Sequence, residues 1–511
     1  MLHLLHVVAL IVVGTCRASL KNAIMEHNDR FERGEISWKA SLNDMVSLTK
    51  QEYRKYLGYS KRQAHLYSQH TSKNYVPIDA SDGMSITIQT RDGPKKVYLN
   101  TPVEDLPEAV DWRLSGFVTP VKNQAGCGSC YAFASVEALE YYVNSNSDRF
   151  MTLSPQQITE CVVNTDECGG TGGCGGGIAE LVYDYVIDHS FGVTDAQWMP
   201  YVSGTNITCV GEDPSQIKFT CKEARTGIVD YRGQNITSPR MYGNITGYTS
   251  LPTNDYQTLM NAVAKIGPVV VNIDASNAAD PNNHMQDAFS AYSGGVFDGC
   301  ALKYNTNSTD INHVVTLDGY GVDPVHGPYW LIRNSWKASY GEGGYIRLRR
   351  QANDSLLCDW DQTPDDGYTC AKPDPTPPQK VCGPCGLLSR AVIPLGANFL
   401  NAEDSSGIYT DPALIGKCPS SGSTTISSGD GAEEEDNGYF LATVVLAILL
   451  ALTMTALVYV GSLLKAANSA ASIAPPKRST STVEGTSNPM ALRPVSSKRD
   501  DDKIPKAEND L

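Results

Sequence analysis

The chain has 511 residues, which is enough for one core of roughly 200 to 300 residues with several appended segments. Its formal net charge is −15, with 41 Lys and Arg against 56 Asp and Glu, and we expect no nucleic-acid partner. Its 14 cysteines can form lasting disulfides only in an oxidising compartment, such as the one that a secreted protein enters.

Residues 1–18 have the features of a secretory signal peptide. The apolar run Val7 to Val13 is followed by small residues, as expected before a cleavage site. A buried N-terminal strand is the alternative. Five Asn-x-Ser/Thr sequons agree with passage through the secretory pathway and are candidate glycosylation sites: Asn206, Asn235, Asn244, Asn307 and Asn353.

Residues 19–106 form a polar segment of mixed charge. Its first half has helical patterns, and its second half is looser around Asp82-Gly83 and Asp92-Gly93-Pro94. We predict that this segment is a prodomain with a linker to the next domain.

A helix is predicted to begin at Cys130. Gly126, Gly128 and Ser129 favour tight turns before it, and apolar residues then recur at helical spacing through Leu139. The unpaired N–H groups and the positive end of the dipole at a helix N-terminus lower the pKa of a thiol. Cys130 is therefore a candidate nucleophile.

Two neighbours of Cys130 carry further information. Gln124 lies six residues earlier, where a turn could bring its side-chain N–H donors back to the cysteine to stabilise an oxyanion. Cys127 and Cys130 together could instead form a disulfide, a redox pair or half of a zinc site, and an isolated Cys-x-x-Cys leaves these alternatives open.

The second half of the chain is rich in β-patterns. Residues 130–190 have helical patterns, whereas 266–273, 311–320, 328–333 and 343–349 are β-rich runs bounded by Gly and Pro. This order predicts an α+β fold. His313 and Asn334 fall in or just after these runs and are the candidate partners of a cysteine nucleophile, although a lone strand histidine is more often structural.

The C-terminal part predicts a membrane anchor. Residues 397–438 are poor in large apolar groups and are predicted to be a flexible stalk. Residues 440–464 carry no charge, which predicts a transmembrane helix, with a buried core helix as the alternative. Lys465, Lys477 and Arg478 follow, so a disordered tail of residues 465–511 is expected in the cytosol, in type I topology.

The segments around these candidate residues resemble those of papain-family, cathepsin L-like cysteine proteases. The resemblance covers Gln124 to Glu140 and the strands of His313 and Asn334, and Leu106 to Arg113 resembles the mature N-terminus. It implies a catalytic domain at 107–396, with an insertion at about 350–384, and a two-lobed fold with the active site in the cleft between a helical lobe and a sheet lobe. Segments within 24–54 resemble the second half of the inhibitory propeptide, and the first half of that pattern is missing.

The resemblance assigns catalytic roles to four residues. Cys130 and His313 would form a thiolate–imidazolium pair, Asn334 would orient the imidazole, and Gln124 would stabilise the oxyanion. Trp336 would shield the hydrogen bond between His313 and Asn334. Two positions depart from the family pattern, because Tyr131 stands where tryptophan is usual and Lys337 stands where glycine is usual.

Substrate binding is implied for a second set of residues. By composition alone the glycine run after Cys174 is a flexible loop, but it resembles the family segment that lines the cleft. The segment Cys385 to Arg390 resembles the family's closing segment, which implies that Arg390 lies at the base of the pocket for the substrate residue second upstream of the cleaved bond, where it could accept acidic or tyrosine-like side chains. Alternatively, Arg390 points to solvent or pairs with a local carboxylate. The residues implied in substrate binding are Gly176, Gly177, Asn272, Asn312, Trp336 and Arg390.

Setting aside Cys16 and Cys130 leaves twelve of the 14 cysteines, and all twelve can pair. The resemblance implies the disulfides Cys127–Cys174, Cys161–Cys209 and Cys300–Cys385. Connectivity cannot be fixed from sequence, and a zinc site within Cys358 to Cys385 is an alternative. Six cysteines have no assigned partner: Cys168, Cys221, Cys358, Cys370, Cys382 and Cys418.

These features predict a membrane-tethered cysteine endopeptidase, made as a zymogen, that works in an acidic endolysosomal lumen or at the cell surface. Its expected partners are protein or peptide substrates, its own prodomain and the membrane, and no cofactor or metal is expected. A catalytically silent receptor or adhesion protein with the same fold is one alternative. A redox protein that uses Cys127 and Cys130 is another.

Overall fold

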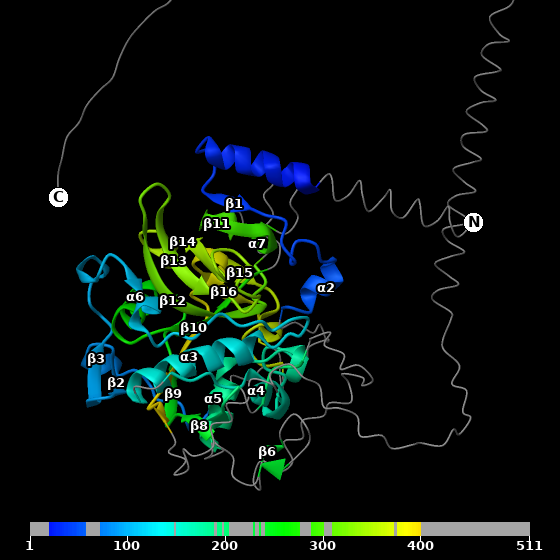
Figure 1. Ribbon diagram of the computed structural model, residues 1–511. Coiled ribbons are helices and arrows are strands. Elements are labelled where there is room, and N and C mark those ends of the chain that lie inside the picture. Colours follow the sequence, from blue (N-terminus) through cyan, green and yellow to red (C-terminus); the bar gives the residue numbers. More distant parts are fainter. Residues whose placement is uncertain are drawn as a thin grey trace, which may run out of the picture. The chain divides into compact units, whose positions relative to one another are not determined.

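A computed structural model gives the structure of the chain (Figure 1). It describes residues 20–57, 72–147, 150–188, 192–196, 199–203, 228–229, 235–236, 241–275, 288–300, 309–371 and 376–399. The predicted signal peptide, the transmembrane span 440–464, the tail and nearly all of the stalk lie outside these residues. Within the described ranges, no helix combines the length and apolar character that crossing a bilayer requires.

A nine-stranded sheet forms the centre of the second half of the chain. Strands β11 and β14 pair in parallel, and the other pairs are antiparallel. The strand order is β1 (Trp38–Ala40), β11 (Tyr292–Phe297), β14 (Tyr345–Arg349), β13 (Gly327–Arg333), β12 (His313–Asp323), β10 (Val269–Ile273), β17 (Ala391–Leu395) and β9 (Gly247–Ser250), with β4 (Val110–Asp111) on β12. The four predicted β-rich runs correspond to β10, β12, β13 and β14.

The helical part of the fold is built on α3 (Cys130–Ser147). This helix is buried along most of its length, and it contacts α4 (Pro155–Cys161), α5 (Ala179–Asp188) and strand β12. Figure 1 shows α3, α4 and α5 gathered together beside the strands. The α+β class and the two-lobed arrangement predicted from the sequence are confirmed. Other α-helices in the described residues include α2 (Lys50–Arg54), α6 (Tyr256–Lys265) and α7 (Ala288–Ala291).

The predicted prodomain extends the main sheet. Residues 20–32 are helical, and β1 then pairs with the edge strand β11, with Trp38 opposite Gly295. Helix α2 begins after Thr49, which forms a capping box with Glu52. The prediction of a loose second half was wrong, because β2 (Ser85–Thr90) and β3 (Gly93–Tyr98) pair as a hairpin.

The predicted insertion at 350–384 has a structure of its own. Strands β15 (Cys358–Asp361) and β16 (Gln379–Cys382) form a separate two-stranded sheet, and the 3₁₀ helix η9 (Pro364–Asp366) follows β15. The other small sheets are β5 (Val193–Thr194) with β8 (Met241–Asn244) and β18 (Asn398–Phe399), and β6 (Ile228–Val229) with β7 (Asn235–Ile236).

Candidate active site

Cys130 is the first residue of helix α3, so the prediction of a helix start there is confirmed. Its side chain is buried and forms no disulfide. The carbonyl of Ser129 accepts hydrogen bonds from the N–H groups of Ala132 (2.9 Å) and Phe133 (3.2 Å), and these bonds close the first turn. Cys130 therefore lies at the positive end of the helix dipole, where a thiolate is stabilised.

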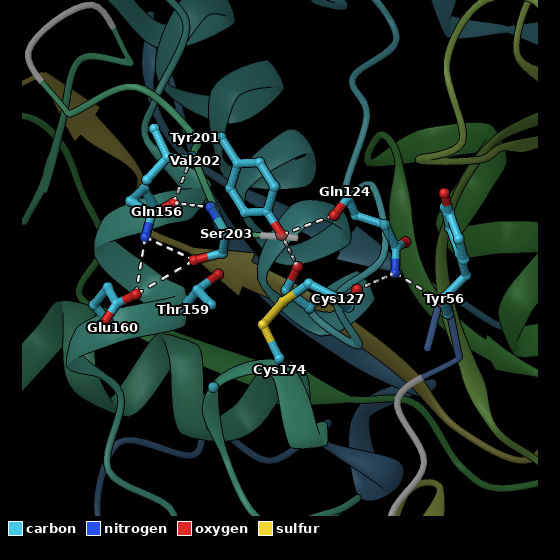
Figure 2. The surroundings of a disulfide bond; sticks show 12 residues. Tyr56, Gln124, Cys127, Gln156, Thr159, Glu160, Cys174, Tyr201, Val202 and Ser203 are labelled. Carbon is cyan, nitrogen blue, oxygen red and sulfur yellow. Dashed lines mark hydrogen bonds between the residues drawn. A yellow bond between two sulfur atoms is a disulfide. The ribbon is translucent and has the colours of Figure 1, made fainter. Parts of the chain in front are cut away.

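A disulfide holds the loop before Cys130. Cys127 is bonded to Cys174, and the N–H of Gly128 donates to the carbonyl of Cys174 at 3.1 Å (Figure 2). The redox and zinc alternatives for Cys127 with Cys130 are therefore wrong, because the sulfur of Cys127 is already bonded. The hydroxyl of Tyr201 lies 2.7 Å from that of Ser129 and donates to the carbonyl of Gln124 at 2.9 Å, which fixes both ends of this loop.

Gln124 is oriented by Ser335. The hydroxyl of Ser335 donates to Oε1 of Gln124, and the backbone N–H of Gln124 donates to the carbonyl of Ser335 at 2.9 Å. Because Oε1 accepts this hydrogen bond, the orientation of the amide is fixed and Nε2 points away from Ser335 as a donor. It donates to the carbonyls of Cys127 (2.9 Å) and Tyr56 (2.7 Å), as Figure 2 shows.

His313 and Asn334 meet across the pairing of β12 with β13. Nε2 of His313 lies 2.9 Å from Oδ1 of Asn334, and both side chains are fully buried. The ring of Trp336 stacks on the imidazole at 4.9 Å between centroids. Burial lowers the pKa of His313 to about 4, although the hydrogen bond with Asn334 acts in the opposite direction.

The prodomain lies against this site. The hydroxyl of Tyr53 donates to the carbonyl of Ala275 at 2.8 Å, and its ring packs edge-on to Trp336 at 5.6 Å. The ring of Tyr56 is also edge-on to Trp336, at 6.5 Å. The carbonyl of Tyr56 therefore accepts a hydrogen bond from Nε2 of Gln124, and the ring of Tyr56 packs against Trp336, which stacks on His313.

Tyr131 fills the aromatic position after Cys130. Its ring is buried, and its hydroxyl donates to the carbonyl of Gly173 at 3.3 Å. A Cβ on Gly177 would lie 2.9 Å from this ring, so glycine is required there. The carbonyl of Gly176 accepts from the N–H of Gly172 at 2.8 Å. The glycine run is thus a packed loop, and its composition alone does not reveal this.

Arg390 forms a local ion pair. Its guanidinium forms an ion pair with Glu180, whose side chain is 3% exposed, while that of Arg390 is 27% exposed. This is the local carboxylate pairing that the sequence left open. Its charge is therefore already compensated, so Arg390 has little to offer a substrate carboxylate.

The other two predicted binding residues engage neighbouring backbone. Nδ2 of Asn272 donates to the carbonyl of Gly367 at 3.4 Å, and Oδ1 of Asn312 accepts from the N–H of Ala275 at 3.2 Å. Both side chains are buried. Sequence reasoning did not anticipate that Gly367, in the insertion, contacts Asn272.

Four disulfides lie within the described residues. Cys127–Cys174 and Cys300–Cys385 are pairs that the resemblance implied, whereas Cys168–Cys370 and Cys358–Cys382 had no predicted partners. The zinc alternative for Cys358 to Cys385 is wrong, since these cysteines are consumed in disulfides. Cys161 is also disulfide-bonded, and its expected partner Cys209 lies outside the described residues, as do Cys221 and Cys418.

A buried charge network links the elements that carry Cys130 and His313, and no local sequence pattern indicates it. Arg333, just before Asn334, is fully buried and pairs with Asp318 at 3.0 Å and Glu137 at 3.5 Å. Its guanidinium also donates to the carbonyl of Thr119 at 3.2 Å. Because Glu137 belongs to α3 and Asp318 to β12, the network joins the helix of Cys130 to the strand of His313.

The sequons are accommodated differently. Asn353 is exposed and caps the turn that follows it, whereas Asn244 is half-buried. Asn235 lies in β7. Asn206 and Asn307 lie outside the described residues.

Comparison with known proteins gives consistent matches. Residues 106–364 match the family model described as papain family cysteine protease. The chain is 31% identical over 335 residues to the senescence-specific cysteine protease SAG12 of Arabidopsis thaliana, covering 65% of this chain and 77% of that protein. It is 29% identical to cathepsin L of Sarcophaga peregrina, covering 65% and 80%. The solved structure of digestive procathepsin L 3 of Tenebrio molitor larval midgut is 26% identical, with coverage of 74% and 90% and a TM-score of 0.46.

Proposed function

The chain belongs to the papain family of cysteine proteases and is a cysteine endopeptidase, and we propose that it is made as a membrane-tethered zymogen whose reaction is carried by Cys130 and His313. The hydrogen bond between His313 and Asn334 supports this assignment most directly. It fixes the imidazole at Nε2, which leaves Nδ1 as the nitrogen that serves the cysteine.

The proposed reaction proceeds by acyl transfer. The thiolate sulfur of Cys130 forms a bond to the substrate carbonyl carbon, and Nε2 of Gln124 donates to the resulting oxyanion. His313 gives its proton to the leaving amine as the C–N bond breaks. Water then attacks the thioester while His313 accepts its proton, which releases the acid and restores the thiol.

The contact between Gln124 and Tyr56 carries the zymogen proposal. Nε2 of Gln124 is the proposed oxyanion donor, and here it donates to a prodomain carbonyl at 2.7 Å. Tyr53 and Tyr56 also pack edge-on against Trp336, whose ring stacks on His313, and burial lowers the pKa of His313 to about 4. An imidazole with such a pKa is neutral at cytosolic and lysosomal pH, so the thiolate–imidazolium pair is disfavoured until the prodomain leaves.

One further ion pair fastens the prodomain to the catalytic domain. Lys337 stands where the family usually has glycine, and it adopts a left-handed φ of 69°. Its ammonium pairs with Asp44 of the prodomain at 2.9 Å. Both side chains are at least half exposed. We therefore assign this pair a minor role in the affinity of the prodomain for the catalytic domain and a larger role in aligning the two.

Substrates are proposed to lie along the glycine run and the β10–β12 edge. Gly176, Gly177, Asn312 and Asn272 would line the cleft upstream of the cleaved bond, Arg390 would lie beneath it, and Trp336 would lie on the other side of Cys130.

The membrane tether is proposed from the apolar span 440–464. The catalytic domain would then face the lumen of an acidic endolysosomal compartment or the cell exterior, where the disulfides are stable.

Labelling of Cys130 tests the catalytic proposal. The full chain is incubated with an epoxysuccinyl peptide probe at acidic pH, before and after removal of the prodomain. We expect labelling at Cys130 only after removal. Absence of labelling in the processed protein, or equal labelling of both forms, would contradict the catalytic or the zymogen proposal respectively.

A further inference from the structure

The tip of the insertion crosses onto the helical part of the fold. Residues 364–370, which we name the strap, follow β15 and end at Cys370. Cys370 is bonded to Cys168, which lies in the loop before the glycine run. The N–H of Gly169 also donates to the carbonyl of Thr369 at 2.9 Å. The strap is therefore fastened at both ends, by strand β15 and by this disulfide.

The strap contacts the walls of the proposed upstream pocket. The carbonyl of Gly367 accepts from Asn272, and a Cβ on Gly367 would lie only 1.7 Å from the carbonyl oxygen of Ile311. Ile311 directly precedes Asn312 and His313 in the chain. Ile178, which directly follows the glycine run, forms a buried cluster with Cys168 and Cys370.

Tyr368 is the large side chain that the strap places beside the walls of the proposed upstream pocket. It is buried with Ile311 and Val381. Burial raises its pKa, and the nearby guanidinium of Arg390 acts in the opposite direction, so the phenol lies within electrostatic reach of Arg390. Asn272, Ile178, Ile311 and Tyr368 are all less than a tenth exposed.

We propose that the strap fills the pocket for the substrate side chain second upstream of the cleaved bond with Tyr368, and that the Cys168–Cys370 disulfide locks it there. This inference rests on the proposed function, because that function defines the pocket. With the pocket filled, the enzyme selects peptides that carry glycine or alanine at that position and discriminates against leucine and phenylalanine.

The test compares fluorogenic peptides that differ only at this position, with Ala or Leu, on processed enzyme. Active sites are counted by titration with an epoxysuccinyl inhibitor, and mass spectrometry verifies that the buried Cys168–Cys370 bond survives the assay. For the unaltered enzyme we expect kcat/KM for the Ala peptide to exceed that for the Leu peptide by at least about tenfold.

Two variants remove the strap by different means. Tyr368→Ala empties the pocket, and the double variant Cys168→Ser, Cys370→Ser unlocks the strap. Each should raise kcat/KM for the Leu peptide by about tenfold or more while leaving the Ala peptide within about threefold. The matched control Cys358→Ser, Cys382→Ser removes the other disulfide of the same insertion and should leave the ratio unchanged.

The outcomes separate this inference from the proposed function. If the unaltered enzyme has the same kcat/KM for the Leu peptide as for the Ala peptide, the strap does not fill the pocket. If Tyr368→Ala retains full active-site titration with an unchanged ratio, the inference is overturned even where the double variant fails to fold. Failure of the unaltered enzyme to cleave any peptide or to label at Cys130 would contradict the proposed function instead.

Discussion

His313 and Asn334 are joined by a buried hydrogen bond of 2.9 Å between Nε2 and Oδ1. His313 begins strand β12 and Asn334 directly follows the neighbouring strand β13, 21 positions later in the chain, and the ring of Trp336 stacks on the imidazole. Exclusion of water strengthens such a bond and fixes the imidazole plane. The imidazole is thereby held ready to exchange protons through Nδ1.

The first prediction separates the roles of nucleophile and orienting group. Cys130→Ala removes the atom that bonds to substrate and should abolish peptide hydrolysis. Asn334→Ala removes only the restraint on the imidazole, so kcat should fall less severely, by roughly 10- to 100-fold, with KM nearly unchanged. A fluorogenic peptide assay on processed enzyme measures both.

Asn334→Gln serves as the control for this pair, because it keeps an amide oxygen and should restore part of the activity lost in Asn334→Ala. Full activity in Cys130→Ala would remove the protease assignment. A loss in Asn334→Ala as complete as that in Cys130→Ala would give Asn334 a larger role than orientation.

The second prediction concerns Ser335 as a positioning residue. Ser335→Ala frees Oε1 of Gln124, so the side-chain amide can turn over and present oxygen to the oxyanion. For Ser335→Ala we expect kcat to fall by about tenfold with little change in KM. For Gln124→Ala we expect kcat to fall by about 100-fold. The double variant should be no worse than Gln124→Ala alone. Additive losses would show that Ser335 acts independently of Gln124.

The proposed catalytic residues could be singled out from the sequence because each lies in a distinctive local pattern. Glycines and a helical period identify the start of α3 at Cys130, and a β-pattern surrounds His313. The hairpin β2–β3 also left a signal, since Ile86 and Ile88 alternate with polar residues before Asp92-Gly93. That alternation is typical of a half-buried strand, whereas the turn residues beside it favour a loop.

Pairings between residues far apart in the chain could not be predicted. Arg390 and Glu180 are 210 positions apart, and Cys168 and Cys370 are separated by 202. No local period or spacing relates such residues, because only the folded chain brings them together. For Arg390 the sequence left both substrate recognition and local pairing open, since its partner Glu180 appears in sequence as an ordinary residue of a helix.

The third prediction is that acid favours activation. Residues 107–396 contain 31 Asp and Glu against 18 Lys and Arg, whereas residues 19–106 contain 11 against 13, so the two segments attract each other. Protonation of carboxylates with ordinary pKa values of about 4 weakens that attraction. Release of the prodomain should therefore be faster at pH 4.5 than at pH 7 at fixed salt. Equal rates of processing at the two pH values would refute this account.

The fourth prediction concerns Asp361, which supports the start of the strap. It accepts hydrogen bonds from the N–H groups of Thr363 (2.9 Å) and Ile311 (3.2 Å). Burial raises its pKa to about 7, and the charges of Asp310 and Asp274 act in the same direction. Because the folded state holds this proton more tightly than the unfolded state, Asp361 stabilises the fold below about pH 4 and loses that contribution as pH rises toward 7.

Asp361→Asn should remove this dependence on pH. The variant loses one hydrogen bond at every pH, but its unfolding free energy relative to the unaltered protein should rise by on the order of 2 to 4 kcal/mol between pH 4 and pH 7. Thermal unfolding in the Cys130→Ala background, which prevents self-digestion, measures the difference. A difference in Tm that stays constant with pH would show that Asp361 does not titrate in this range.

The fifth prediction concerns the buried network of Arg333. Replacing it by methionine leaves Asp318 and Glu137 buried without their counter-charge, and breaking such a pair costs about 3 to 5 kcal/mol. The matched control is Arg349→Met, in β14, whose side chain is 28% exposed and lies 3.7 Å from Asp298. Removing that pair should cost less than about 1 kcal/mol. Because the network joins α3 to β12, Arg333→Met should also lower kcat in whatever fraction remains folded. Similar losses of Tm in the two variants would show that burial does not make the Arg333 network more important for stability than an exposed ion pair.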